Sequence, residues 1–210
     1  MRVRTLIVIG CGLSTLCVAG MAAQEGAADR PPLAVSSATV TIEGTSKRDP
    51  FVASTRAVHI TGLRLAEPRL PDVLQQALRP GQLAALDVTI PVMTLTSPDK
   101  GVDAHIQRSL KADIHPEIRF RLRSIDKGAE DARGFIRLIA NGTLAIAGIE
   151  REVALNVTVL PAGRSLIVDG STDVRMTDFG VTPPAGLFGL LKTDPVIHVR
   201  FYLVVIPTPD

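Results

Sequence analysis

The sequence contains little cysteine, and none that we expect to remain in the folded protein. Its 2 cysteines, Cys11 and Cys17, lie in an apolar N-terminal stretch that is typical of a cleaved signal. A mature chain without cysteine has no disulfide, no thiol nucleophile and no cysteine-based metal site. The roughly 187 residues after this stretch must be stabilised by a core of their own, and they are enough for one sizeable domain.

Aromatic residues and net charge are also low. Tryptophan is absent, there is 1 tyrosine, and the aromatic residues together make up 3% of the chain. The 23 basic residues nearly balance the 21 acidic ones, and removal of Arg2 and Arg4 with the N-terminal stretch makes the two numbers equal. Proteins bind nucleic acid through an excess of Lys and Arg, helped by stacking aromatics. The composition therefore argues against a nucleic-acid partner.

Motifs for catalysis and metal binding are missing as well. The 4 histidines are His59, His105, His115 and His198, and they show neither HxxxH nor HExxH spacing. The sequence has no GxSxG elbow and no glycine-rich phosphate loop. We therefore expect no enzymatic activity, no bound metal and no cofactor. The alternative in which the protein is an enzyme is a hydrolase or isomerase that uses His59 or His198.

The N-terminal stretch has the three parts of a secretory signal peptide. Arg2 and Arg4 precede an almost uncharged apolar run over residues 6–21, and the small residues Ala22 and Ala23 follow it. This order predicts cleavage after Ala22 or Ala23. The mature protein is then expected to be periplasmic or secreted from a bacterium, and not an integral membrane protein.

The domain organisation follows from this cleavage. Residues 1–23 are the expected signal peptide, residues 24–35 a disordered lead-in rich in Ala, Gly and Pro, and residues 36–210 one folded domain. Two alternatives change the N-terminus only. One is an uncleaved anchor, for which the apolar run is short, and the other is a lipoprotein signal that ends at Cys11.

Alternation of apolar and polar residues predicts strands along most of the domain, because successive side chains of a strand point to opposite faces. Strands are expected at residues 38–46, 54–65, 84–92, 117–125, 164–173 and 196–206, and in a hairpin over residues 141–159. Helical spacing of apolar residues predicts short helices within residues 68–80 and 97–112. The strands do not alternate with helices, so the pattern favours an antiparallel barrel or sandwich.

Two of these strands show which side chains face inward. In the hairpin, Leu155 and Val157 share one apolar face, and Gly148 suits a tight turn that we place at residues 148–151. In the strand of residues 117–125, three apolar residues alternate with three arginines, and we expect the arginines to face solvent. The apolar residues are Ile118, Phe120 and Leu122, and the arginines are Arg119, Arg121 and Arg123.

Three segments resemble the YceI family of small exported proteins. They are LKADIHPEIRF at residues 110–120, GTLAIAGIEREVALNV at residues 142–157 and RMTDFGV at residues 175–181. The tripeptide GTS at residues 44–46 also resembles part of the family, in which a His and a Trp usually follow. Here KRDPF follows instead and the chain has no Trp, so the first turn of the barrel departs from that pattern.

The resemblance implies an all-β fold: an extended, antiparallel, eight-stranded, lipocalin-like barrel with one or two short helices. It also implies a carrier for a long-chain isoprenoid or another amphiphilic lipid, and eight strands can enclose one elongated ligand. The ligand-binding residues expected on the inward faces are Leu86, Val88, Ile118, Phe120, Leu122, Leu155, Val157, Phe179, Phe188, Ile197, Val199 and Phe201. The alternative is an interaction or assembly module of the cell envelope whose barrel is filled by its own side chains.

The apolar segment at residues 176–192 has two interpretations. It carries Phe179 and Phe188 with three leucines in a stretch that is otherwise typical of a loop, so these side chains must pack on something. The segment could fold across one mouth of the barrel as a lid over the ligand. It could equally plug the barrel as an additional piece of core.

Overall fold

The computed structural model of the chain describes the folded domain and leaves its N-terminal segment aside. The described residues are 31–44, 51–66, 73–79, 81–182 and 195–208. The expected signal peptide at residues 1–23, most of the expected lead-in and Phe188 lie outside the described residues.

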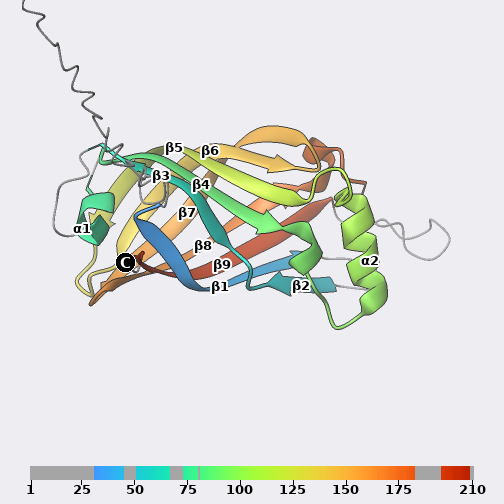
Figure 1. The fold of residues 1–210 in the computed structure, drawn as a ribbon, viewed down its shortest axis with the longest axis horizontal. Helices are drawn as coiled ribbons and strands as arrows, with labels where there is room; N and C mark the ends of the chain where they lie inside the picture. Colours follow the sequence, from blue (N-terminus) through green and yellow to red (C-terminus); the bar gives the residue numbers. More distant parts are fainter. Residues whose placement is uncertain (1–30, 45–50, 67–72, 80, 183–194, 209–210) are drawn as a thin grey trace, which may run out of the picture. The chain divides into compact units, whose positions relative to one another are not determined.

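One antiparallel sheet of nine strands forms the domain and curls into a barrel (Figure 1). The strands are β1 (Leu33–Gly44), β2 (Phe51–Thr55), β3 (His59–Leu65), β4 (Leu83–Pro91), β5 (Glu117–Glu130), β6 (Ile136–Ile146), β7 (Ile149–Ala162), β8 (Ser165–Arg175) and β9 (Val196–Pro207). Their order in the sheet is β2-β1-β9-β8-β7-β6-β5-β4-β3. The expected all-β barrel is thus confirmed.

Strands β2 and β3 together fill one position in the barrel wall, which is how nine strands make an eight-stranded arrangement. Strand β2 pairs with β1, whereas β3 pairs with β4. The single strand expected at residues 54–65 is therefore wrong, because the chain leaves one neighbour to join another. The break is a local turn in which Thr55 Oγ1 accepts a hydrogen bond of 3.1 Å from the backbone N–H of Ala57.

Short helices lie at both ends of the barrel. Helix α1 (Val73–Ala77) connects β3 to β4 at the end that we call the α1 end, and α2 (Lys100–Ser109) connects β4 to β5 at the α2 end (Figure 1). The 3-10 turns η1 (Val92–Thr94) and η2 (Met176–Phe179) also lie in connections at the α2 end. Both helices fall inside the ranges predicted from the sequence.

Helix α2 is shorter than predicted because its boundaries are set by local backbone chemistry. The carboxylate of Asp99 accepts a hydrogen bond of 2.7 Å from the backbone N–H of Gly101 and so caps the first turn. At the other end, Lys111 has a φ of 53°, which a helix cannot continue.

The turn of the central hairpin lies earlier than the sequence predicted. Strand β6 ends at Ile146 and β7 begins at Ile149, so Ala147 and Gly148 form a two-residue turn instead of residues 148–151. Both have positive φ, 51° at Ala147 and 83° at Gly148, as a type I′ turn requires. From the sequence, only Gly148 was expected to adopt a positive φ.

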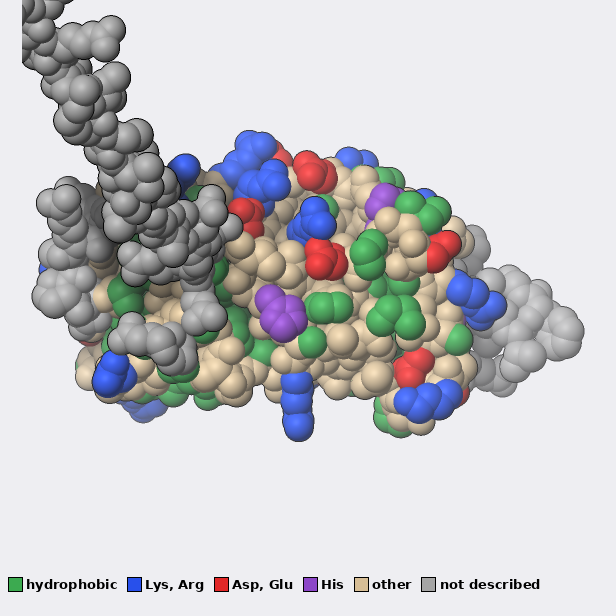
Figure 2. Space-filling model, in the orientation of Figure 1, with side chains coloured by type: hydrophobic (Ala, Val, Ile, Leu, Met, Phe, Trp, Pro, Cys, Tyr) green, Lys and Arg blue, Asp and Glu red, His purple; other side chains and the backbone are tan. Residues whose placement is uncertain are grey.

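The outer face of the wall is polar, as expected from strand β5. Figure 2 shows basic and acidic side chains beside one another on this face. The three arginines of β5 are exposed and make ion pairs with Glu117, Asp87 and Glu152, at 2.9 Å, 3.1 Å and 2.8 Å respectively. Exposed pairs of this kind stabilise a fold little, so the arginines are a solvated surface.

Among the described residues, buried side chains form one cluster at each end of the barrel and a smaller one, of Ala38, Val40 and Val58, on the wall between them. At the α1 end, Leu33, Leu74 and Val205 belong to one buried cluster, and at the α2 end Met176 and Phe179 belong to another. Leu33 is only 4% exposed and begins β1, so the last residues of the expected lead-in at 24–35 belong to the folded domain. Burial of this side chain fixes the start of the strand.

Candidate ligand-binding cavity

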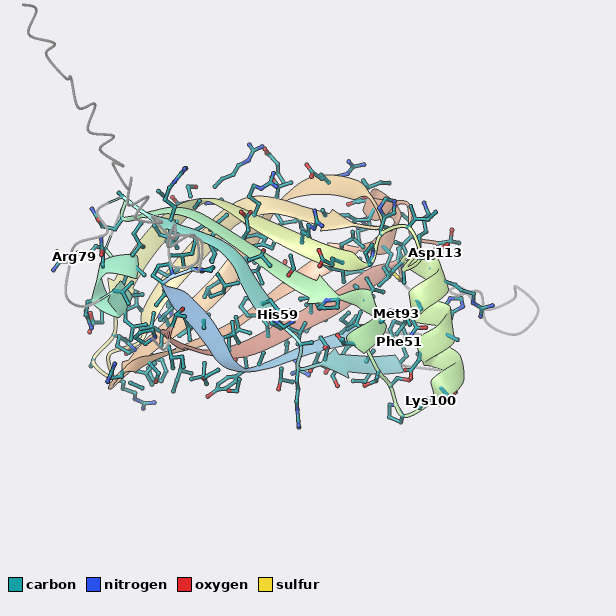
Figure 3. All side chains as sticks on the ribbon, in the orientation of Figure 1. Phe51, His59, Arg79, Met93, Lys100 and Asp113 are labelled. Atoms are coloured by element: carbon teal, nitrogen blue, oxygen red, sulfur yellow. The ribbon has the colours of Figure 1, made fainter. Side chains whose placement is uncertain are left out.

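A cavity of about 570 Å³ runs through the barrel between the two packed ends. Its wall includes Leu63 and Leu83 toward the α1 end, and Phe51 and Phe179 toward the α2 end; Figure 3 shows Phe51 on β2. The volume lies within the range of pockets that hold small organic ligands, which is about 300–1,000 Å³. The barrel is hollow.

The cavity is long as well as apolar. Along β9, every second residue from Ile197 to Val205 lines it, and at about 3.3 Å per residue this stretch of strand extends on the order of 25 Å. Nearly all of the described lining side chains are aliphatic or aromatic. The shape therefore suits one flexible hydrocarbon chain, with dispersion contacts along its length and few hydrogen bonds.

Exposure of the inward side chains supports the same conclusion. Val88, Leu155 and Phe201 point into the barrel, yet each is only partly buried. A residue in a filled core would be almost completely buried, as Leu74 is at 5% exposed. The accessible part of these three side chains faces the cavity.

The residues that the sequence predicted for ligand binding lie together at this cavity. All of the twelve except Phe188, which is outside the described residues, are part of its wall. Phe179 lines the cavity and also packs into the buried cluster at the α2 end, where it is 3% exposed.

Three phenylalanines lie flat against glycines of the neighbouring strand. The ring of Phe201 covers Gly170, its direct partner across β8 and β9, and the ring of Phe120 covers Gly142. At the α2 end, the ring of Phe51 covers Gly44 in the same way. None of these glycines lines the cavity, whereas all three rings do. A ring that occupies the place of a missing side chain on the wall leaves the centre of the barrel open.

Helix α2 contributes a face of the cavity that the sequence interpretation missed. Val102, His105, Ile106, Ser109 and Leu110 line the cavity, at the spacing of one helix face. The sequence identified the apolar stripe of this helix, but for His105 it weighed only metal ligation against a surface or capping role. His105 follows Val102 by three residues, and this helical spacing is the signal that places it on the inward face.

Asp103 holds α2 against the loop that precedes it. Its carboxylate accepts hydrogen bonds from the backbone N–H of Ser97 at 2.5 Å and from Lys100 Nζ at 3.2 Å. The Ser97 bond, followed by the influence of Lys100, lowers the pKa of Asp103 below its ordinary value of 3.8.

The D103N variant is expected to be less stable than the natural protein at neutral pH, and the difference should shrink in acid. A carboxyl with a lowered folded-state pKa contributes stability above its unfolded pKa, and that stability is lost as pH falls through the folded pKa. Thermal midpoints measured at about pH 7 and below the ordinary value of 3.8 test this. The exposed Asp113→Asn is the control. A difference that persists unchanged in acid would contradict the role of the carboxylate.

Two other histidines lie outside the cavity. His59 and His198 are exposed on the outer wall, on β3 and β9, and His198 Nδ1 lies 2.7 Å from Asp173 Oδ1 on the neighbouring strand (Figure 3 labels His59). In the described part of the chain, no group of three or more His, Cys, Asp or Glu side chains is placed to hold a metal ion. A search of the same residues finds no helix with the length and apolar character needed to span a membrane.

Comparison with known proteins identifies relatives of this barrel. Residues 67–205 match the YceI-like domain family. No protein with curated information matches the chain.

Solved structures with the same fold share little sequence with the chain. BcnA of Burkholderia cenocepacia has 18% identity and a TM-score of 0.61, over 80% of this chain and 95% of that one. A polyisoprenoid binding domain from Saccharophagus degradans, implicated in plant cell wall breakdown, has 7% identity and a TM-score of 0.62, over 85% and 100%. The YceI protein of Campylobacter jejuni has 15% identity and a TM-score of 0.52, over the whole of both chains. These similarities establish the fold.

Proposed function

The chain belongs to the YceI-like family, and on this basis we propose that it is an exported carrier of one elongated hydrophobic or amphiphilic molecule. The proposed ligand is of polyisoprenoid or fatty-acyl type and lies inside the barrel. The observation that carries the proposal is the apolar cavity of about 570 Å³ between two packed ends. A polyisoprenoid binding domain among the solved structures of the same fold supports this class of ligand.

The energetics of the cavity favour transport over catalysis. A chain of methylene or isoprene groups gains about 0.8 kcal/mol for each CH₂ transferred from water into such an environment. The wall offers this gain along its whole length, whereas His59 and His198 are exposed on the outer surface, away from the cavity. The proposal therefore assigns no catalytic step to the protein.

Hollowness also distinguishes the carrier from a solid interaction module. A module needs a packed interior to support its outer surface, and filled interiors leave few voids larger than a water molecule. Here a cavity of about 570 Å³ remains inside the barrel, and Val88, Leu155 and Phe201 on its wall are only partly buried. We infer that a ligand completes the core when it is bound.

Export is part of the proposal and rests on the N-terminal sequence. Arg2 and Arg4, the apolar run that follows them, and Ala22 with Ala23 have the order of a signal peptide. The carrier would then act in the periplasm or outside the cell, where a lipid must cross water between membranes.

Native mass spectrometry of the protein purified from its own host tests both parts. The intact mass should correspond to a chain that begins at Ala23 or Gln24. An additional mass should disappear on organic extraction and be recovered in the organic phase as a lipid. A protein that starts at Met1 in the membrane fraction would refute export. A ligand-free protein that also fails to take up geranylgeraniol would refute the carrier.

A further inference from the structure

His105 places an imidazole at the wall of an otherwise apolar cavity. His105 lies on α2, one helical turn before Ser109, and both residues line the cavity. The Nε2 atom of its ring is buried and finds no hydrogen-bond partner among the described residues. Buried polar atoms in native proteins almost always have a partner, because an unpaired one loses its hydration without compensation. A ligand head group that enters beside the ring would supply the missing partner once the ring turns Nε2 toward it.

Polar lining groups are concentrated at the end of the barrel where His105 lies. Asp99, Ser109 and Thr182 line the cavity near the α2 end, together with the backbone of Gly101. The lining at the α1 end is aliphatic, and its residues include Leu33, Leu63, Ala77, Leu78, Leu83 and Leu166. A ligand with one polar end is therefore oriented, with that end beside α2 and its chain toward α1.

The charges at this end argue against an anionic head group. None of the described lining residues is a lysine or arginine, and the one charged side chain among them is Asp99. Its carboxylate already accepts a hydrogen bond from Gly101 and would repel a phosphate. A hydroxyl can both donate and accept, so it can pair with Nε2 in either tautomer of a neutral imidazole. A carbonyl can pair with Nε2 when that nitrogen carries the proton.

We propose that Nε2 of His105 hydrogen-bonds an uncharged hydroxyl or carbonyl head group, and that this contact selects and orients the ligand. The proposal rests on the carrier function and adds the class of head group and its direction in the barrel. The apolar wall contacts the chain of the ligand, and the imidazole of His105 contacts its head group.

Three probes with the same C20 isoprenoid chain test the proposal: geranylgeraniol, the corresponding hydrocarbon without the hydroxyl, and geranylgeranyl diphosphate. The natural protein should bind the alcohol about tenfold more tightly than the hydrocarbon, the ratio expected for one hydrogen bond at a buried site. It should bind the diphosphate more weakly than the alcohol. In His105→Leu, the alcohol and the hydrocarbon should bind equally, since leucine keeps the apolar contact without the polar atom. His59→Leu, on the outer wall, is the matched control and should keep the preference.

A spectroscopic measurement keeps the test independent of the variant's folding. In the natural protein, the ¹⁵N resonance of His105 Nε2 should shift when geranylgeraniol binds and should not shift with the hydrocarbon. Equal binding of both probes by the natural protein, tightest binding of the diphosphate, or an unmoved Nε2 resonance would overturn this inference and leave the carrier intact. Failure to bind any of the three probes would instead overturn the carrier function itself.

Discussion

Replacing Phe179 with alanine is expected to lower the free energy of unfolding of the ligand-free protein by about 3–5 kcal/mol. The ring is 3% exposed and packs with Ile146, Met176 and Val181 in the buried cluster at the α2 end. Removal of a buried aromatic side chain forfeits its transfer free energy and leaves a void that the rigid strand ends cannot fill. Of the two interpretations of this segment, the burial of Phe179 favours the piece of core.

Urea unfolding of the ligand-free protein measures this loss, and the exchange rate of a fluorescent prenyl probe is measured beside it. Arg121→Ala is the control, because this side chain is 67% exposed and its substitution should change stability by less than about 0.5 kcal/mol. If Phe179→Ala accelerated probe exchange while stability stayed nearly unchanged, Phe179 would act as a lid.

Replacing Gly170 with alanine is expected to close the middle of the cavity. A β-carbon at Gly170 would collide with the ring of Phe201 on β9, and it would come within 2.7 Å of the backbone oxygen of Asn156 on β7. The ring can move toward the cavity, whereas the contact with the Asn156 oxygen requires a shift of β7 itself. Affinity for geranylgeraniol should fall at least about tenfold, and the displaced ring should cost about 1–3 kcal/mol of stability.

Removal of the ring provides the control for this variant. The double variant Gly170→Ala with Phe201→Ala should recover part of the affinity, because the new methyl group no longer pushes a ring into the cavity, although its contact with the Asn156 oxygen remains. Binding titrations of both single variants and the double variant form a complete cycle. Additive losses in that cycle would mean that Gly170 and Phe201 act independently, and the account of the open centre would be wrong.

Local alternation was enough to predict the wall of the barrel from the sequence. Residues such as Leu86, Val88 and Phe120 alternate with polar neighbours, and strand geometry then fixes which of them face inward. The same pattern identified the solvated arginines of β5. Alternation shows on which side of a strand a residue lies. The lining of a barrel consists of the residues on the inward side, so alternation predicts it.

Features that depend on pairing between strands could not be predicted in this way. Across residues 54–65 the inward positions change phase at the break, because Thr55 of β2 faces inward while Val58 and Ile60 do so after it, and each half follows its own partner strand. The contact of Phe201 with Gly170 is a property of register between β8 and β9. A single strand carries no information about the residue that lies opposite.

The candidate site shows the same division. The apolar wall followed from the sequence, whereas the role of His105 requires the position of α2 relative to the barrel. A histidine on a predicted helix can face solvent, a metal or a cavity, and its neighbours in the chain do not decide between these. Burial of Nε2 without a partner is a tertiary property.

The break between β2 and β3 leaves one line of the barrel wall without a continuous ladder of hydrogen bonds. The two edges of the sheet meet where β1 approaches β3, and among the described strands no ladder of hydrogen bonds joins these two. Residues 56–58 join the two edges covalently, and β2 is also hydrogen-bonded to the segment after β4, through the backbones of Ser54 and Thr96 and the hydroxyls of Thr55 and Thr94. A fully closed barrel has a diameter set by its strand number and stagger, and widening it ruptures backbone hydrogen bonds. Here, in the part of the wall that the structure describes, only the few hydrogen bonds of Ser54 and Thr55 with Thr96 and Thr94 stand in for a ladder, so we expect the wall to yield along this line at a smaller cost than elsewhere.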